Sequence, residues 1–410
     1  MASKVGIERI NIYGSSMFID QKKLALARDK DPDKTVKDFL IDTRSINPLW
    51  EDTVTMGANA AKKVVEAMDP KEIGMVIVGT EGSVDFGKPI STNIIGALGL
   101  HNNIRNYETK HACYSGVAAL DTAVNWVASG LNKGKKALVI AADFSREHLN
   151  TKEEFVMGGA AAALVIGEDP KVVEFEADKK GTWTTNVYDT FRPSALKEVG
   201  NNEVSLYSYL DALEGAYEEY CRQSGEIVNF DDYFTHNLYH TPFPGMAFQA
   251  HRTLCNLARP RSKAEIKEDF EKRVQPGLKF SRRLGSTYGS SNFVGLCALL
   301  SKGSTAKPGE RIGLFAYGSG AIGEYYSAVI CPEALETVSA MKIDEELDKR
   351  REVSIAEYEN IEKMRNSFIE KADFVPDFSM FNGWYEEHYN NKGLLVLKEV
   401  KDFYRTYDWS

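Results

Sequence analysis

One stretch decides how this chain is organised: residues 110–141 read KHACYSGVAALDTAVNWVASGLNKGKKALVIA. After Cys113, apolar residues recur at helical spacing: Val117, Leu120, Val124 and Val127. The repeat stops at Gly130, and residues 137–141 form an apolar run that predicts a buried strand. The stretch therefore predicts an irregular segment, a helix and a strand, with Cys113 at the beginning of the helix.

Cys113 is the first candidate for chemistry. Amides at a helix N-terminus and the positive end of the helix dipole favour a thiolate, the form of cysteine that attacks carbonyls. The small neighbours Ala112, Ser115 and Gly116 leave room for a substrate to approach the sulfur. The alternative is a buried apolar side chain, which is the commoner fate of cysteine.

The plan of this stretch is repeated along the chain. A helix is predicted over 54–68 and strands over 75–78 and 161–166. The second half repeats the plan with a helix over 204–220, a strand ending near His240, a helix from Gly289, and strands over 312–316 and 325–330. From Cys113 to Ala137 is 24 positions, and from Gly289 to Ile312 is 23. We therefore expect an α/β fold of two copies of one unit, with largely parallel buried sheets covered by helices.

Composition excludes several classes of function. The 410 residues are 43% hydrophobic and 27% charged, as in an ordinary globular protein with a large core. The net charge of −9, without a long basic run, argues against a nucleic-acid partner. The five scattered cysteines give no disulfide framework and suit a reducing compartment. No signal-like start or bilayer-length apolar run is present, so we expect a cytoplasmic protein without a membrane partner.

Three further segments carry structural predictions. Residues 343–365 are highly charged with mixed signs, which predicts a solvated helix. Residues 259–276 predict a surface helix that ends before Pro276, and residues 393–400 predict a strand docked on the body.

Glu81 is the candidate base. It follows the predicted strand 75–78 between small residues, and such sheets present active groups at the carboxyl ends of their strands. Partial burial would raise its pKa and suit it to proton abstraction. The alternative is a loop carboxylate that caps a turn, and Asp85 is a weaker rival.

His240 is the candidate partner across the crevice, because it ends a predicted strand before a helix that begins near Gly245. His236 and His240 lie four residues apart, but they share a strand and no third ligand of matching context appears, so no metal site is predicted. His111 is interpreted as structural. Residues 317–320, Tyr-Gly-Ser-Gly, could offer backbone amides to an oxyanion or form a plain tight turn.

At these four segments the sequence resembles the 3-hydroxy-3-methylglutaryl-CoA synthase family of the thiolase superfamily, along nearly its whole length. The match rests on residues 80–88, 112–116, 240–243 and 317–320. More narrowly, residues 240–252 and 394–410 are similar to the branch that installs β-methyl branches in polyketides. The resemblance implies a five-layered αβαβα thiolase fold and a homodimer. It also implies an N-terminal half over 1–170 and a C-terminal half over 171–410, and the second half would carry charged helical insertions and a C-terminal extension.

The family also implies roles for individual residues. Cys113 would accept an acetyl group from a donor thioester, Glu81 would remove a proton from the acetyl methyl, and His240 would polarise a β-keto acceptor. The backbone N–H groups of Cys113 and of Ser319, within the loop Gly318 to Gly320, would lie near the acyl oxygen.

The implied activity is a carbon–carbon bond-forming acyl transfer through an acyl-cysteine intermediate. An acetyl-derived or short acyl carbon would add to the β-keto group of a polyketide thioester, giving a 3-hydroxy-3-methylglutaryl-like branch precursor. Phosphopantetheine thioesters on donor and acceptor acyl carrier proteins, or CoA thioesters, would be the substrates, with no cofactor and no metal.

Two departures from the family pattern keep alternatives open. Ser286 stands where the family usually has an asparagine that helps hold the acceptor. Residues 244–249 lack the lysines that follow the histidine motif in CoA-using relatives, which weakens the case for free CoA. The alternatives are a CoA-dependent synthase of isoprenoid metabolism, a ketoacyl-carrier-protein synthase III, which would lack Glu81, and an inactive homologue that only docks carrier proteins.

Overall fold

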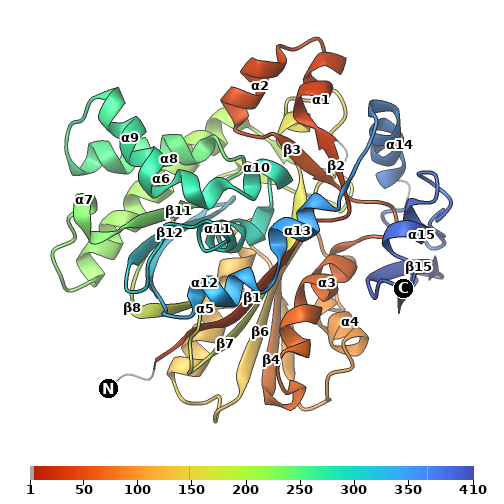
Figure 1. Cartoon of the computed structure of the whole chain (residues 1–410), viewed down its shortest axis with the longest axis horizontal. Coiled ribbons are helices and arrows are strands. Elements are labelled where there is room, and N and C mark those ends of the chain that lie inside the picture. The colour runs from red at the N-terminus through yellow and green to blue at the C-terminus, as the bar shows by residue number, and fades with distance from the viewer. Residues whose placement is uncertain (1–3, 147, 367) are drawn as a thin grey trace.

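The structure is a computed structural model that describes residues 4–146, 148–366 and 368–410. A nine-stranded sheet runs through the molecule in the order β11-β12-β13-β8-β1-β7-β6-β4-β5 (Figure 1). Its strands are β1 (Gly6–Tyr13), β4 (Ile73–Gly79), β5 (Arg105–Thr109), β6 (Lys136–Phe144), β7 (Gly159–Gly167), β8 (Val173–Thr184), β11 (His236–Tyr239), β12 (Arg311–Gly318) and β13 (Ile322–Ile330).

The sheet contains one pairing pattern twice. In the first half, β4 is parallel to β6, β6 is antiparallel to β7, and β7 is antiparallel to β1. In the second half, β11 is parallel to β12, β12 is antiparallel to β13, and β13 is antiparallel to β8. The halves join where Gly6 and Ile7 of β1 pair with β8. The predicted α/β architecture of two copies of one unit is confirmed. The expectation of largely parallel sheets is wrong, because five of the eight pairings in the nine-stranded sheet are antiparallel, those that join β12, β13, β8, β1, β7 and β6 in turn. A division of the chain at residue 170 stays a prediction.

Helices form three layers around the two halves of the sheet. α5 (Ser115–Ala128) packs on β4 and β6 and also contacts β8, and α11 (Ser291–Leu299) packs on β11 and β1. The backbones meet at the N-terminal ends of these two helices, where a Cβ on Gly116 would lie 2.3 Å from the carbonyl oxygen of Gly289. α3 (Thr53–Glu66) and α4 (Ile90–Ala97) cover one outer face, and α6 (Asn202–Gln223), α8 (Met246–Ala258) and α9 (Lys263–Arg273) lie on the other side (Figure 1).

The expectation of one solvated helix over 343–365 is wrong. The segment forms α13 (Ile343–Asp348), β14 (Arg351–Glu352) and α14 (Ile355–Arg365). β14 interrupts the helix because it pairs with β2 (Met17–Asp20), and the side chain of Ser354 then caps α14. α14 is also not solvated all round, since Tyr358 and Ile361 are buried.

The predicted C-terminal strand is confirmed as β15 (Leu395–Lys401), which forms a hairpin with β16 (Tyr404–Trp409). The hairpin docks beside α3, where the amide of Leu395 donates to Asn59 Oδ1 at 2.7 Å and Tyr407 Oη donates to Asp52 Oδ2 at 2.7 Å. α15 (Trp384–His388) lies next to it (Figure 1). The C-terminal residues therefore pack against the first half of the chain.

Short elements complete the fold. They are α1 (Gln21–Ala27), α2 (Pro32–Phe39), β3 (Thr43–Ile46), β9 (Thr190–Phe191), β10 (Val199–Gly200), α7 (Phe230–Tyr233), α10 (Ser281–Leu284), α12 (Ala334–Ser339) and the 3₁₀ turns η1 (Pro70–Glu72), η2 (Glu153–Phe155), η3 (Gln275–Leu278) and η4 (Tyr288–Ser290). Of the helices in the described ranges, none combines the length and the apolar character needed to cross a bilayer.

Candidate active site

The predicted site residues follow the carboxyl ends of parallel strands. Glu81 follows β4 and Cys113 follows β5 in the first half, where β4, β5 and β6 are parallel. His240 follows β11 in the second half, and residues 317–320 follow at the end of its parallel neighbour β12. Parallel strands present their carboxyl ends at one edge of a sheet, and Glu81 and His240 lie at the strand ends where the sequence analysis expected them.

Cys113 and Glu81 are in direct contact. The thiol donates to Oε2 of Glu81, and Sγ lies 3.6 Å from that oxygen. Burial raises the pKa of the Cys113 thiol well above its usual range, and the charges of Glu81 and Asp143 raise it further. The expectation of a thiolate at the beginning of the helix is therefore wrong: the dipole of α5 is outweighed by burial and by these carboxylates. Cys113 rests as a thiol with Glu81 as an adjacent proton acceptor.

Asp143, the penultimate residue of β6, fixes the loop that carries Glu81. Its Oδ1 accepts hydrogen bonds from Thr80 Oγ1 at 2.7 Å, from the Glu81 amide at 2.9 Å and from the Gly82 amide at 3.1 Å. Burial, together with the charge of Glu81, raises the pKa of Asp143 to about 7. Asp143 thus holds the backbone of Glu81 and contributes a second, partly protonated carboxyl group to the site.

Arg192 supplies a cation from a distant part of the chain. Its Nη2 lies 3.0 Å from Glu81 Oε1 and 2.7 Å from Glu198 Oε2, and its Nη1 donates to the Glu81 carbonyl at 3.2 Å. Burial raises the pKa of Glu81, the charge of Arg192 lowers it, and the charge of Glu198 raises it. The protonation state of Glu81 is therefore set by a balance between burial and these two neighbours.

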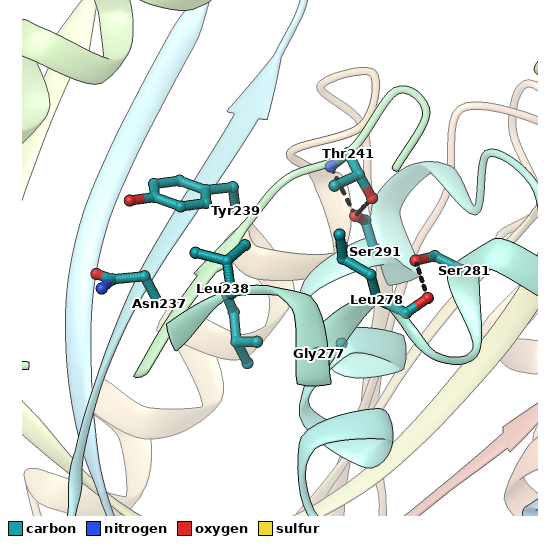
Figure 2. A pocket seen from close by; sticks show the side chains of 10 residues that line it. Asn237, Leu238, Tyr239, Thr241, Gly277, Leu278, Ser281 and Ser291 are labelled. Carbon is teal, nitrogen blue, oxygen red and sulfur yellow. Dashed lines mark hydrogen bonds between the residues drawn. The ribbon is translucent and has the colours of Figure 1, made fainter. Parts of the chain in front are cut away.

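His240 is held by its backbone in the opposite half. Its amide donates to the Phe315 carbonyl at 2.6 Å, and Tyr209 Oη donates to its own carbonyl at 2.8 Å. Figure 2 shows the next residue, Thr241, facing Ser291 of α11, whose Oγ accepts from the Thr241 amide at 2.9 Å. Burial lowers the pKa of His240 to about 3, so its imidazole is neutral at physiological pH.

Tyr317 and Gly318 connect the two halves of the site. The Tyr317 ring centroid lies 6.4 Å from that of His240, and burial and Asp189 raise the Tyr317 pKa. A Cβ on Gly318 would lie only 2.5 Å from the His111 carbonyl oxygen, so this loop packs directly on the Cys113 segment. Cys113 and Glu81 thus touch, and His240 neighbours Tyr317, which lies near the end of the adjacent strand β12. Within the described residues, no hydrogen bond or ion pair joins His240 to Cys113 or Glu81, so their convergence stays a prediction.

Asp189 fixes the loop of residues 317–320. Its Oδ2 accepts from Tyr317 Oη at 2.6 Å and its Oδ1 accepts from the Gly320 amide at 2.9 Å. Gly320 has a φ of 121°, a conformation that side chains with a Cβ rarely adopt. The loop is therefore a specific structure held by a buried carboxylate.

Ser286 is buried in the loop that follows α10. Its amide donates to the Val156 carbonyl at 2.8 Å, and within the described residues no hydrogen bond joins its hydroxyl to Cys113, Glu81 or His240. The structure thus ties the backbone of Ser286 to Val156, and does not bring its hydroxyl into the cysteine–carboxylate pair.

The weaker sequence candidates have structural partners. Asp85 Oδ1 accepts from the amides of Gly87 and Lys88 at 2.6 and 2.7 Å, which is the turn-capping role considered for Glu81. His236, considered with His240 as a metal ligand, instead pairs through Nε2 with Glu310 Oε2 at 3.0 Å.

A small cavity lies beside β11, away from the cysteine–carboxylate pair. It has a volume of about 10 Å³, which is room for about one water molecule. Figure 2 shows its walls, among them Asn237, Leu278 and Ser281. The cavity is thus too small for a thioester substrate.

One cluster of side chains carries atoms of the kind that bind metal ions. Ligand atoms of His251, Cys255 and Asp269 lie within 4.8 Å of one another, at the contact of α8 and α9. Asp269 Oδ2, however, already accepts from His251 Nε2 at 2.8 Å and from Arg273 Nη1 at 3.0 Å, and Arg261 lies 3.9 Å away. Two guanidinium groups neutralise this carboxylate, so we assign the cluster a structural role.

Four residues of the site were not predicted from the sequence: Asp143, Asp189, Arg192 and Glu198. Asp143 could have been found, since it stands at a strand end like Glu81. The other three come from the segment between β8 and α6, and the Arg192–Glu81 contact spans 111 residues. No local spacing signals such a contact.

Together, the repeated α/β unit and the cysteine–carboxylate pair at the strand ends define a thiolase-like protein. Residues 1–171 match the family "Hydroxymethylglutaryl-coenzyme A synthase N terminal", and residues 248–409 match "Hydroxymethylglutaryl-coenzyme A synthase C terminal". The chain belongs to the hydroxymethylglutaryl-CoA synthase family.

Two curated relatives represent different branches of this family. The chain is 35% identical to the "Polyketide biosynthesis 3-hydroxy-3-methylglutaryl-ACP synthase PksG" of Bacillus subtilis, over 98% of this chain and 99% of that protein. It is 33% identical to the "Hydroxymethylglutaryl-CoA synthase" of Enterococcus faecalis, over 87% of this chain and 90% of that protein.

Solved structures extend the comparison. The curacin biosynthetic pathway HMG synthase in complex with acetyl donor-ACP has a TM-score of 0.95 and 35% identity, and the match covers 99% of this chain and 100% of that one. MvaS in complex with 3-hydroxy-3-methylglutaryl coenzyme A has a TM-score of 0.89 and 32% identity, with complete coverage of both chains. The predicted family, the thiolase fold and the synthase-type enzyme class are confirmed.

Proposed function

We propose that this protein is a carbon–carbon bond-forming acyltransferase that builds β-branches on carrier-bound polyketide thioesters. The observation that carries the proposal is the 3.6 Å contact between Cys113 Sγ and Glu81 Oε2, which puts a nucleophile and a base at one point. The similarity to PksG, named as a polyketide biosynthesis ACP synthase, and to the curacin synthase solved with acetyl donor-ACP supports carrier proteins as partners.

The first step is acetyl transfer to Cys113. The sulfur attacks the donor thioester carbonyl, a Cys113 thioester forms, and the pantetheine thiol leaves. Because Cys113 rests as a thiol, its proton must leave during the attack; Glu81 accepts it and the departing pantetheine thiolate finally takes it up. The backbone amides of Cys113 and Ser319 are proposed to stabilise the tetrahedral oxyanion, which the packing of Gly318 against the Cys113 segment supports.

The second step is carbon–carbon bond formation. Glu81 takes a proton from the methyl group of the acetyl-Cys113 thioester, and the resulting carbon nucleophile attacks the β-keto carbon of the acceptor. Since burial keeps His240 neutral, its imidazole polarises the keto oxygen as a neutral hydrogen-bond donor. The new alkoxide takes up a proton, which balances the one removed by Glu81, and water then hydrolyses the Cys113 thioester to a carboxylate.

Ser286 is proposed to line the acceptor side, at the position of the family asparagine. Its burial in the loop before Tyr288, whose ring the Arg192 guanidinium approaches to 5.9 Å, supports this placement. A hydroxyl is shorter than an amide, so we expect the acceptor to be held differently from the acceptor of asparagine-containing relatives.

An intact-mass experiment tests the proposal. Purified protein is offered acetyl carrier protein and acetyl-CoA separately, and we expect a mass gain of one acetyl group from the carrier protein. Loading from acetyl-CoA alone would instead identify a CoA-dependent synthase, the activity named for the Enterococcus faecalis relative. Loading from neither donor would leave an inactive homologue and refute the proposal.

Substitutions separate the two steps. Cys113→Ala is expected to abolish acetyl loading, and Cys221→Ala, which changes a half-buried thiol in α6, is the matched control. Glu81→Ala is expected to load acetyl more slowly than the wild type, because the Cys113 proton must then pass to the leaving pantetheine sulfur without Glu81, and to form no branched product. Near-normal product formation by this variant would remove Glu81 from the mechanism.

We also propose that the protein is a homodimer that works in the cytoplasm, with functional halves over 1–170 and 171–410. β5 is an edge strand of the nine-stranded sheet, and the unpaired backbone of an edge strand invites pairing with a second copy. All five cysteines are free, which suits a reducing compartment. Light scattering that gives a monomer mass at all concentrations would contradict the dimer.

A further inference from the structure

The segment of residues 185–200, between β8 and α6, contacts Glu81 of the cysteine–carboxylate pair. It begins by pairing with the loop after β12, where the Val187 amide donates to the Gly320 carbonyl at 3.0 Å. At its centre, Arg192 reaches Glu81 through one side-chain contact and one backbone contact. Near its end, Glu198 forms an ion pair with the guanidinium of Arg192. A single segment therefore supplies both a cation and an anion to the site.

The geometry of Arg192 is that of a clamp with three partners. Nη2 faces the Glu81 carboxylate at 3.0 Å, Nη1 donates to the Glu81 carbonyl at 3.2 Å, and Nε donates to Glu198 Oε2 at 2.8 Å. The side chains of Arg192, Glu81 and Glu198 are between 13% and 14% exposed, so water screens their charges weakly. Within the described residues Nη2 makes no hydrogen bond, so it meets the Glu81 carboxylate as an ion pair. The hydrogen bonds of Nη1 and Nε fix the orientation of the planar guanidinium, which the ammonium group of a lysine could not reproduce.

From this geometry we propose that Arg192 is a positioning residue for Glu81, which it aims at Cys113 and keeps ionised, and that Glu198 limits this effect by competing for the guanidinium. This inference rests on the proposed function, because it presumes that Glu81 acts as a base. It adds two residues that act through Glu81 and that contact no reacting atom.

The charges predict opposite effects for the two residues. Glu81 must be a carboxylate to accept a proton, so the rate of methyl deprotonation rises as pH rises through its pKa. Arg192 lowers that pKa and Glu198 raises it. Removing the cation therefore shifts the acidic limb of the pH–rate profile to higher pH, and removing the anion shifts the limb to lower pH.

Asp143, Arg146 and the Cys113 thiol also face Glu81. Asp143 binds the Glu81 amide from β6, and Arg146 lies close enough to lower the Glu81 pKa as a minor contribution. The Cys113 thiol donates to Glu81 in the free protein but is acetylated when the methyl proton is removed. None of these groups is substituted in the variants below. Arg192 also lowers the pKa of Asp143, so the shift in Arg192→Met includes the response of that carboxyl group, while its direction is set by the loss of the cation beside Glu81.

The experiment measures hydrogen exchange on the acetylated protein. Protein loaded from acetyl carrier protein is placed in deuterated buffer across a range of pH, and intact mass follows deuterium entering the acetyl methyl group. Arg192→Met is expected to slow exchange about 10- to 100-fold near neutral pH, with recovery at higher pH. Glu198→Gln keeps an oxygen for the Arg192 Nε bond, and its acidic limb is expected at lower pH than in the wild type.

Two further variants complete the test. Lys197→Met removes an exposed cation from the same segment and is expected to leave the profile unchanged. Arg192→Lys keeps the charge and loses the fork, so its acidic limb is expected near the wild-type position with a lower plateau rate.

The outcomes separate the inference from the proposed function. If the wild type never acquires an acetyl group, the proposed function fails. If the wild type loads and exchanges but the limbs of Arg192→Met and Glu198→Gln coincide with the wild-type limb, the inference is overturned while the function stands. Equal slowing of Arg192→Met at every pH would also overturn it, because a merely structural role lowers the rate without moving the limb.

Discussion

Gly318→Ala tests whether close packing of the two halves positions the thiol. A Cβ at residue 318 would lie 2.5 Å from the His111 carbonyl oxygen, 2.6 Å from Tyr114 Cβ and 2.9 Å from the Tyr114 amide nitrogen. Ordinary contacts of a Cβ begin near 3.4 Å, so the closest contact must open by about 0.9 Å. Two of the three atoms belong to the backbone on either side of Cys113, and a rotamer change cannot relieve the overlap.

The displacement gives the expected magnitudes. Added atoms in a packed region cost about 1–3 kcal/mol of unfolding free energy. A misplacement of about 1 Å between reacting groups costs about 100-fold in rate. We therefore expect Gly318→Ala to lose about 1–3 kcal/mol of stability and to load acetyl about 100-fold more slowly than the wild type.

The assay pairs acetyl loading, followed by intact mass, with urea unfolding. Gly96→Ala is the matched control, because a Cβ on Gly96 of α4 would meet nothing within 4 Å. This control should load normally and gain up to about 1 kcal/mol of stability from helix propensity. If Gly318→Ala loads acetyl at the wild-type rate, the packing between the loop and the Cys113 segment does not position the thiol and our reasoning is refuted.

Two further predictions concern buried polar groups. Tyr114 Oη donates to Glu324 Oε2 at 2.6 Å, and burial raises the Glu324 pKa from 4.5 to about 7. Because the folded value exceeds the unfolded one, this carboxyl favours folding at low pH and loses that contribution as pH rises through about 7. Glu324→Gln should therefore gain stability over the wild type between pH 5 and 8, by at most about 3 kcal/mol, and parallel pH dependences in calorimetry would contradict this. Tyr389→Phe removes a donor to the buried Glu51 at 2.6 Å and should cost about 1–3 kcal/mol in urea unfolding; an unchanged midpoint would show that the hydrogen bond is not needed.

Local patterns predicted the elements that carry the site. The spacing of Val117, Leu120, Val124 and Val127 predicted α5, and all four are buried in the structure. Predicted strand ends located Glu81 and His240, and the predicted beginning of a helix located Cys113, while the strand β5 that precedes Cys113 was not predicted. These predictions needed only residues that are neighbours along the chain.

Predictions that depended on distant partners were wrong or absent. The charged run 343–365 was expected to be solvated, but Tyr358 and Ile361 pack in one cluster with Trp50 and Tyr389, from both ends of the chain. The thiolate expectation for Cys113 used only the helix dipole and omitted the carboxylates of Glu81 and Asp143. Arg192 could not be foreseen, because only the folded segment of residues 185–200 brings it to Glu81.

The resting state of the site follows from how its charges are partnered. Three carboxyl groups, Glu81, Asp143 and Glu198, share a poorly hydrated space with the guanidinium of Arg192 and that of Arg146. One more anion would be unfavourable there, which explains why burial and the carboxylates together raise the Cys113 pKa and why Asp143 is partly protonated near pH 7. Acetylation replaces the thiol with a neutral thioester and adds no charge. A site that resists a free thiolate is therefore suited to deprotonate the sulfur only while the donor is being attacked.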